Sequence, residues 1–533
     1  MPGRVHLYDT TLRDGAQTQG VDFGVADKRA IAEALDELGI DYVEGGWPGA
    51  NPTDDAFFAA PPRLRAARFA AFGMTRRAGR SAANDPGLAA VIGAGAPVVT
   101  LFGKTWDFHL REAMGVDLAE GVDMIGGSIA EIVSRGREAI FDAEHFFDGY
   151  KSNPCFARDC LVAARDAGAR WIVLCDTNGG TLPHEVERIV GEVAALVPGE
   201  RLGIHCHNDT ENAVANSLAA VRAGARQVQG TLNGLGERCG NANLTSIVPT
   251  LVLKMGFETG VTPARLARLT HVSRLLDDRL NRPPARGAPY VGESAFAHKG
   301  GVHVSAVEKD SRTYEHVPPE SVGNRRNIVV SDQAGRANVL ARFRELGLEI
   351  AAADARVQRL VEEVKRREHD GFAYDGAEAS FELMARRALG RVPEFFALVS
   401  FRVITERRFN ARGALETLSE ATVKLDAHGR RLLTVGEGNG PVNALDGALR
   451  AALVPIYPGL EGMRLVDYKV RILTPEDGTR AVTRVMIESA DRGGEGGAAR
   501  HWSTVGVSAN VIEASYNALH DAITWKLFKD GAS

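Results

Sequence analysis

The sequence contains few cysteines, no long apolar run and no block of basic residues. Its five cysteines form neither a CxxC pair nor a disulfide framework, which is typical of a reducing compartment. No stretch approaches the roughly 18 to 20 apolar residues of a membrane span, so no membrane partner is expected. The formal net charge of only -5 gives no indication of nucleic-acid binding.

The bulk properties indicate a cytoplasmic protein with more than one domain. Residues 5–8 are already apolar, which leaves no room for the charged and apolar regions of a secretion signal. The content of 44% hydrophobic and 25% charged residues is ordinary for a globular protein. A chain of 533 residues exceeds what one hydrophobic core usually fills, so two or three domains are expected.

Eight short β-branched or aromatic runs alternate with Ala-rich amphipathic stretches in the first 235 residues. This rhythm predicts an α/β fold, a (β/α)8 TIM barrel, with a doubly wound open sheet as the alternative. The polar residues favour the barrel, because nearly every run ends in a chemically capable side chain and barrel strands converge at one face. The runs are 5–8, 42–44, 68–72, 98–102, 139–141, 171–175, 202–205 and 227–230.

A metal site is predicted at those strand ends. His205 and His207 are two residues apart on a strand, so their side chains point to the same face and can share one ion. Asp14, just after the first run, supplies a hard oxygen ligand. The set suits a divalent cation such as Mg²⁺, Mn²⁺ or Zn²⁺. An isolated HxH triplet in a surface or core role is the alternative.

Several motifs resemble those of the metal-dependent acyl-CoA Claisen and lyase superfamily, which includes the 2-isopropylmalate, homocitrate and citramalate synthases. One group of citramalate synthases is the most similar. The motifs are DTTLRDGAQ at 9–17, LFGKTWD at 101–107, FDAEHFFDGYK at 141–151, CDTNGGT at 175–181, the HxH strand, GLGERCGNAN at 234–243 and FAHKGGVH at 296–303.

The resemblance implies an acyltransferase whose acyl group becomes an alkyl group on transfer. Acetyl-CoA, the co-substrate, would condense with pyruvate and water to give (R)-citramalate and CoA, the first step of the pyruvate route to isoleucine. Condensation on a larger 2-keto acid, as in 2-isopropylmalate or homocitrate synthesis, is the nearest alternative. Cys239 leaves an acyl-CoA lyase as a further alternative, because lyases of the superfamily use a cysteine in this loop. The residues around Cys239 are nevertheless those of the synthases. A sensor with an inactive barrel is a third possibility.

The resemblance also implies roles for individual residues at the barrel mouth. Asn241 would join the metal ligands. Arg13 would stabilise the oxygen charge that develops during condensation, or else only tie strand ends together. Glu44 would pair with Arg13 and hold it at the substrate. Glu144 would remove the acetyl methyl proton, unless it only forms a salt bridge on the rim.

Further residues are expected to contact substrate or to come from outside the barrel. Thr177 resembles the residue that binds the keto-acid carboxylate, although a threonine at this place could instead cap a helix. His303 and Tyr314 correspond to catalytic residues that the synthases take from the partner subunit, but residues 304–306 read VSA where many relatives carry an acidic residue and glycine. Bulky side chains would set substrate size, and the candidates are Phe72, Met74 and Phe102.

Three domains are predicted: a catalytic barrel at 1–270, linker subdomains at 271–390 with helical periodicity at 331–349 and 354–367, and a C-terminal α+β domain at 391–533. The last contains a pseudo-repeat, since Thr434-Val435-Gly436 and Thr504-Val505-Gly506 each close a strand before a helix with matching apolar positions. By resemblance it is a regulatory domain for an amino-acid feedback inhibitor, and it would pair across a homodimer.

Overall fold

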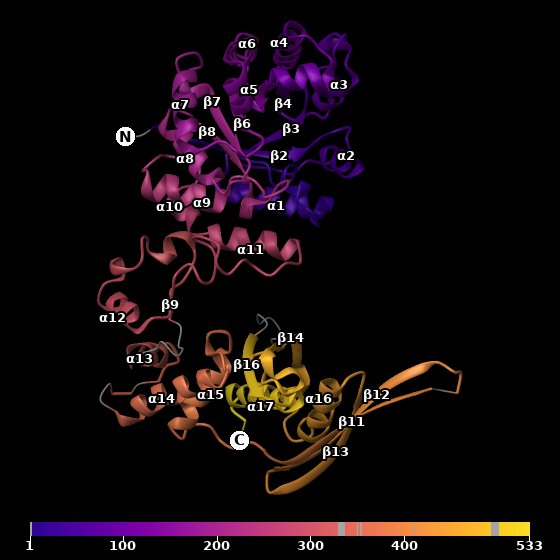
Figure 1. The fold of residues 1–533 in the computed structure, drawn as a ribbon, viewed down its shortest axis with the longest axis vertical. Coiled ribbons are helices and arrows are strands. Elements are labelled where there is room, and N and C mark those ends of the chain that lie inside the picture. The colour runs from indigo at the N-terminus through magenta and orange to yellow at the C-terminus, as the bar shows by residue number, and fades with distance from the viewer. Residues whose placement is uncertain are drawn as a thin grey trace. The chain divides into compact units, whose positions relative to one another are not determined.

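The computed structural model describes residues 3–328, 336–348, 350–351, 354–409, 411–491 and 500–532 (Figure 1). The chain forms two compact units. The first comprises Met1–Phe296 with Glu315–Arg326, and the second comprises Ala297–Tyr314 with Asn327–Ser533. Among the described residues, no helix is both long and apolar enough to cross a membrane.

The first unit contains a closed barrel of eight parallel strands that pair in chain order, with β1 next to β8. This confirms the predicted TIM barrel and rules out the open sheet. Every predicted run overlaps a strand, although Val5 precedes β1 and several strands extend further than expected. The strands are β1 His6–Asp9, β2 Tyr42–Gly46, β3 Arg68–Met74, β4 Val98–Lys104, β5 Glu138–Glu144, β6 Trp171–Asp176, β7 Leu202–Cys206 and β8 Gln227–Gly230.

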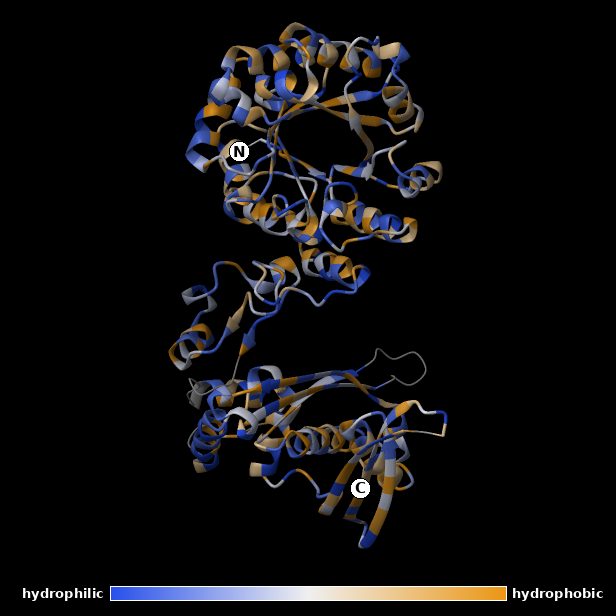
Figure 2. Cartoon of the chain, turned by 45° about the vertical axis from the view of Figure 1, so that its right-hand side comes forward, coloured by the Kyte–Doolittle hydropathy of each residue, from blue (hydrophilic) through white to orange (hydrophobic). Residues whose placement is uncertain are grey.

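The barrel strands are buried on both faces, as parallel strands usually are. Val99 and Leu101 of β4 face the outer layer of helices, whereas Val98 belongs to a separate cluster inside the barrel with Tyr42 and Trp171. Figure 2 shows mixed orange and blue along the surrounding helices, as amphipathic helices require. These helices are α1 Val25–Leu38, α2 Pro52–Ala59, α3 Pro86–Gly93, α4 Leu118–Ser134, α5 Phe146–Ser152, α6 Pro154–Asp166, α7 Pro183–Val193, α8 Ala213–Arg222, α9 Leu244–Pro249, α10 Pro263–Leu266 and α11 Leu269–Arg279.

The second unit begins with short strands and helices. Strands β9 Ala297–His298 and β10 Asn327–Ile328 pair in parallel. Of the two helices expected at 331–349 and 354–367, the first is described from α13 Arg336–Glu345, and residues 331–335 and 349 lie outside the described residues. The second is α14 Ala355–His369. Helix α12 Gly301–Lys309 precedes α13 along the chain, and α15 Glu378–Ala388 follows α14.

The C-terminal part of the second unit consists of two copies of three antiparallel strands followed by a helix. The first copy has β11 Ala397–Phe409, β12 Leu415–Ala427, β13 Arg430–Gly438 and α16 Pro441–Leu453. The second has β14 Met463–Ile472, β15 Thr483–Asp491, β16 Arg500–Ser508 and α17 Val511–Lys529. Each sheet therefore ends in a strand that leads directly into a long helix, as the sequence pattern indicated.

Matching contacts hold sheet to helix in both copies. The Thr434 hydroxyl donates to the carbonyl of Ala448, and the Thr504 hydroxyl donates to the carbonyl of Ala518, each at 2.8 Å. A β-carbon on Gly436 would lie 2.4 Å from the Ala448 nitrogen, and one on Gly506 would lie 2.0 Å from a carbonyl oxygen of α17. Both glycines are therefore needed for the helix to approach its sheet.

Candidate active site

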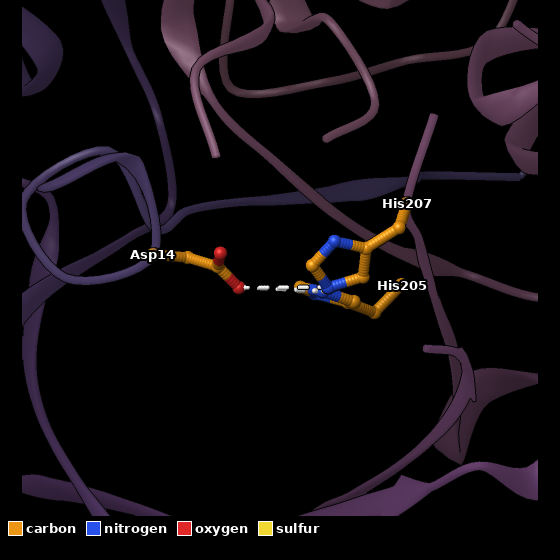
Figure 3. A group of neighbouring side chains, drawn as sticks. All are labelled: Asp14, His205 and His207. Carbon is orange, nitrogen blue, oxygen red and sulfur yellow. Dashed lines mark hydrogen bonds and ion pairs between the residues drawn. The ribbon is translucent and has the colours of Figure 1, made fainter. Parts of the chain in front are cut away.

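Three buried side chains meet at the carboxyl end of the barrel (Figure 3). Asp14 follows β1, His205 is on β7 and His207 lies just beyond the end of that strand. Oδ2 of Asp14 is 3.6 Å from Nε2 of His205 and 3.9 Å from Nε2 of His207, and the two imidazole nitrogens are 3.3 Å apart. The structure thus brings the predicted ligands together around one point.

The charge states of these side chains suit a cation. Burial alone would raise the pKa of Asp14, but Arg13 and the two imidazoles outweigh it and lower that pKa to about 2. Burial lowers the pKa of His205, and burial with the adjacent imidazole lowers the pKa of His207 to about 3. At neutral pH the site therefore presents one carboxylate and two neutral imidazoles, which are donors for a divalent ion.

Asn241 lies beside this group on the glycine-rich loop after β8. Its backbone forms an antiparallel bridge with His207, and its amide Oδ1 is buried without a hydrogen-bond partner among the described residues. Gly236 has a φ of 154°, and a β-carbon there would lie 2.5 Å from Nδ2 of Asn241. The loop geometry and the unpaired oxygen fit Asn241 as a fourth ligand.

Arg13 is fixed beside the metal-ligand group by two carboxylates and a ring. Its Nε donates to Oε2 of Glu44 at 2.7 Å, its Nη1 donates to Asp14 at 3.2 Å, and its guanidinium lies 3.7 Å from the ring centre of Phe72. Burial would lower the pKa of Arg13, but the two carboxylates reverse this and raise it. Glu44 is fully buried and also accepts from the hydroxyls of Tyr8 and Thr10.

A pocket opens over the metal-ligand group. Phe72 and Phe102 form one wall with stacked rings 5.4 Å apart, and Trp47 packs edge-on against both at 5.7 Å. Glu44 supports Arg13 from below and does not line the pocket. Met74 instead lines a second, mainly apolar cavity. The pocket is lined by Arg13, Asp14, Gln17, Trp47, Phe72, Phe102, Asp142, Glu144, Cys175, Thr177, His205, His207, Glu237 and Arg238.

Glu144 and Thr177 both line the pocket. Glu144, at the end of β5, forms an ion pair with Lys104 at the end of β4, with 2.5 Å between Oε2 and Nζ. The rim salt bridge, the alternative role for Glu144, is thus present, and it leaves Glu144 facing the pocket. Oγ1 of Thr177 accepts from the backbone N–H of His145 at 2.9 Å. Thr177 does not cap a helix, since α7 begins at Pro183.

His303 and Tyr314 belong to the second unit. His303 lies on α12, and its ring centre is 4.2 Å from that of Tyr314. Both side chains are exposed. The structure therefore pairs these two residues with each other, and their catalytic role stays a prediction.

Sequence reasoning missed several residues of the site. Gln229 on β8 contacts His205, and Asp142 on β5 contacts Gln229. Trp47 completes the aromatic wall, and Arg238 holds both oxygens of Asp209 at 2.7 and 2.9 Å. A signal was present for two of them, because Asp142 directly follows the run 139–141 and Gln229 is a polar residue inside the run 227–230. Their partners became evident only from the barrel register.

Comparison with known proteins covers nearly the whole chain. The HMGL-like family model matches residues 4–275, the homocitrate synthase post-HMGL domain-like model matches 290–371, and the LeuA allosteric (dimerisation) domain matches 375–527. The (R)-citramalate synthase of Aquifex aeolicus is 50% identical over 532 residues, which is 99% of each chain.

Other relatives show the same pattern. The (R)-citramalate synthase of Geobacter sulfurreducens is 50% identical over 98% of each chain. A probable 2-isopropylmalate synthase of Methanopyrus kandleri is 33% identical over 97% of each chain. The chain is thus more similar to these (R)-citramalate synthases than to this 2-isopropylmalate synthase, as the sequence motifs indicated. The chain therefore belongs to the HMGL-like family, within its group of (R)-citramalate synthases.

Proposed function

We propose that this enzyme condenses acetyl-CoA with pyruvate and water to give (R)-citramalate and CoA. The observation that carries the proposal is the grouping of Asp14, His205 and His207 under a pocket edged by Arg13, in a chain half identical from end to end to (R)-citramalate synthases. The bulky aromatic wall of the pocket supports a small keto acid. The relatives that act in 2-isopropylmalate synthesis are more distant.

The metal-ligand group would hold a divalent cation, with Asn241 as a further ligand. When bound, such an ion would supply Lewis-acid polarisation of the keto-acid carbonyl. Mg²⁺, Mn²⁺ and Zn²⁺ all accept a set of two imidazoles, a carboxylate and an amide oxygen. Arg13 would stabilise the negative charge that grows on the ketone oxygen, because Glu44 fixes its guanidinium before substrate arrives.

Glu144 would take the proton from the methyl group of acetyl-CoA. Its ion pair with Lys104 holds the carboxylate at the pocket rim, where it can accept a proton from the bound substrate. The hydroxyl hydrogen of Thr177 would donate to the keto-acid carboxylate, since its oxygen already accepts from the backbone of His145. His303 and Tyr314 would assist enolate formation or thioester hydrolysis.

The remaining chain would regulate and assemble the enzyme. We place the catalytic domain at 1–270, the linker subdomains at 271–390 and the regulatory domain at 391–533, which would bind an amino-acid inhibitor. A homodimer is supported by the match to a dimerisation domain and by apolar side chains on the outer sheet faces. Leu433, Val435, Val466 and Val470 are 62%, 54%, 53% and 48% exposed.

The decisive experiment measures CoA release from acetyl-CoA with pyruvate, 2-ketobutyrate, 2-ketoisovalerate and 2-ketoglutarate. Each substrate is assayed after chelation and after adding back Mg²⁺, Mn²⁺ or Zn²⁺. We expect the highest kcat/KM with pyruvate and no turnover in the chelated enzyme. Equal or greater turnover with 2-ketoisovalerate would assign the enzyme to 2-isopropylmalate synthesis instead.

A further inference from the structure

A chain of hydrogen bonds runs behind one of the proposed metal ligands. Nδ1 of His205 lies 3.0 Å from Oε1 of Gln229, and Nε2 of Gln229 donates to Oδ1 of Asp142 at 2.9 Å. All three side chains are buried, with 5%, 0% and 3% of their surface exposed. The other imidazole nitrogen, Nε2, faces Asp14 and His207. The hydrogen bonds therefore end at Nδ1, on the side of the ring opposite the nitrogen that would bind the cation.

The tautomer of His205 decides whether that nitrogen can bind a metal. A neutral imidazole carries one proton, so Nε2 offers a lone pair only when Nδ1 holds the hydrogen. An amide oxygen facing Nδ1 favours this tautomer, whereas an amide NH₂ group would favour the opposite one. The direction in which the Gln229 amide points therefore controls the metal-binding state of His205.

Gln229 cannot fix its own direction, because its amide has an accepting and a donating end of similar shape. Asp142 supplies the missing asymmetry. Its Oδ1 accepts from the NH₂ group of Gln229, both as a carboxylate and as an acid protonated on Oδ2. Turning the amide around would set the Gln229 oxygen against Oδ1 of Asp142.

We propose that Asp142 is a positioning residue that orients the Gln229 amide and thereby holds His205 in the Nδ1–H tautomer required for metal binding. This inference rests on the proposed metal site and assigns roles to two residues outside the ligand set. Partners of this kind orient ligands and tune affinity, and their loss typically weakens metal binding about 10- to 100-fold.

The same strand offers a matched control. Gln227 is two residues from Gln229 on β8, so both side chains point to the same side of the barrel wall. Gln227 is equally buried, and neither of its amide atoms has a hydrogen-bond partner among the described residues. Replacing Gln227 therefore shows the effect of losing a buried amide on β8 while the relay, the hydrogen-bonded series Asp142–Gln229–His205, stays intact.

The test measures the Kd of Mn²⁺ alone for the metal-stripped full-length chain by electron paramagnetic resonance. The first set contains the parent, His205→Ala, Gln229→Leu, Asp142→Leu and Gln227→Leu. We expect Gln229→Leu to weaken binding about ten-fold or more. Asp142→Leu should weaken it less, about five-fold, because Gln229 remains next to His205 but its amide is no longer oriented. Gln227→Leu should stay within about two-fold of the parent.

The second set of variants separates the orientation of the group facing His205 from the presence of a carboxyl group nearby. The carboxylate introduced by Gln229→Glu has no donating end, so Asp142→Leu/Gln229→Glu should recover the parent Kd to within about two-fold. Asp142→Leu/Gln227→Glu introduces the same carboxyl group away from His205 and should remain about five-fold weak. Thermal unfolding checks that each variant is folded. If Asp142→Leu does not fold, Gln229→Glu should still bind Mn²⁺ about five-fold tighter than Gln229→Leu.

If Asp142→Leu binds Mn²⁺ as tightly as the parent, the proposed role of Asp142 is refuted. It is also refuted if Gln229→Glu and Gln227→Glu restore the Mn²⁺ affinity of Asp142→Leu equally. These results are distinguishable from failure of the proposed function. If His205→Ala binds Mn²⁺ as tightly as the parent, the metal site itself is wrong, and the relay is refuted with it.

Discussion

Phe102 separates the substrate pocket from a mainly apolar cavity behind it. Its ring lines both spaces, whereas Met74, Met114 and Met124 line only the second. The ring also stacks on Phe72 and contacts Trp47. Phe102→Ala would therefore join the two spaces and allow a larger 2-keto acid to extend into the cavity. We predict that this substitution shifts specificity from pyruvate toward 2-ketoisovalerate.

The size of the shift follows from the added surface. 2-Ketoisovalerate carries two more carbons than pyruvate, and burying each is worth about 0.8 kcal/mol. The ratio of kcat/KM for 2-ketoisovalerate to that for pyruvate should therefore rise by about 1.6 kcal/mol, or about 15-fold. Because Phe102 is only partly buried, unfolding should become easier by about 2 kcal/mol, below the 3 to 5 kcal/mol of a fully buried ring.

The assay measures CoA release at 25 °C with each keto acid, after thermal unfolding has shown that the variant is folded. Met114→Ala is the matched control, because Met114 lines the cavity but not the substrate pocket. It should leave the ratio within about two-fold of the parent. An unchanged ratio in folded Phe102→Ala, or an equal shift in Met114→Ala, would refute the role of this ring as the partition.

Four further predictions concern the metal-ligand group and its surroundings. His205→Ala should abolish turnover while circular dichroism stays unchanged, and a fully active variant would remove the metal from the mechanism. Glu44→Gln should lower kcat about 10- to 100-fold with little change in Mn²⁺ affinity, because it frees the arginine and not the ligands; an unchanged kcat would contradict this. Because burial keeps both histidines neutral, Mn²⁺ binding at pH 6.5 should release almost no protons by calorimetry in two buffers, whereas two imidazoles of ordinary pKa would release about one. Cys239→Ser should keep full condensation activity, since this exposed thiol does not line the pocket, and loss of activity would favour a lyase.

The strands and the ligand group were predictable from the sequence because their signals are local. Residues two apart on a strand share a face, and the ends of parallel barrel strands converge, so His205, His207 and Asp14 could be brought together without coordinates. The same reasoning located the pseudo-repeat. Each of these inferences depends only on spacing along the chain.

Other parts of the site depend on how strands align across the barrel. Met74 was expected at the substrate because it is a bulky side chain at a strand end. In the barrel register it pairs with Phe102, and it lines only the cavity behind that ring. The relay from Asp142 to Gln229 joins β5 to β8, which are not adjacent strands, so only the closed interior brings these residues into contact.

The duplicated contact between sheet and helix in the second unit makes its two halves comparable modules. Thr434 with Gly436, and Thr504 with Gly506, occupy corresponding places, so a substitution studied in one copy has a built-in counterpart in the other. Alanine at either glycine should loosen one helix and leave the other as an internal reference. Unequal responses to paired substitutions would then report which copy depends more on this contact for its stability.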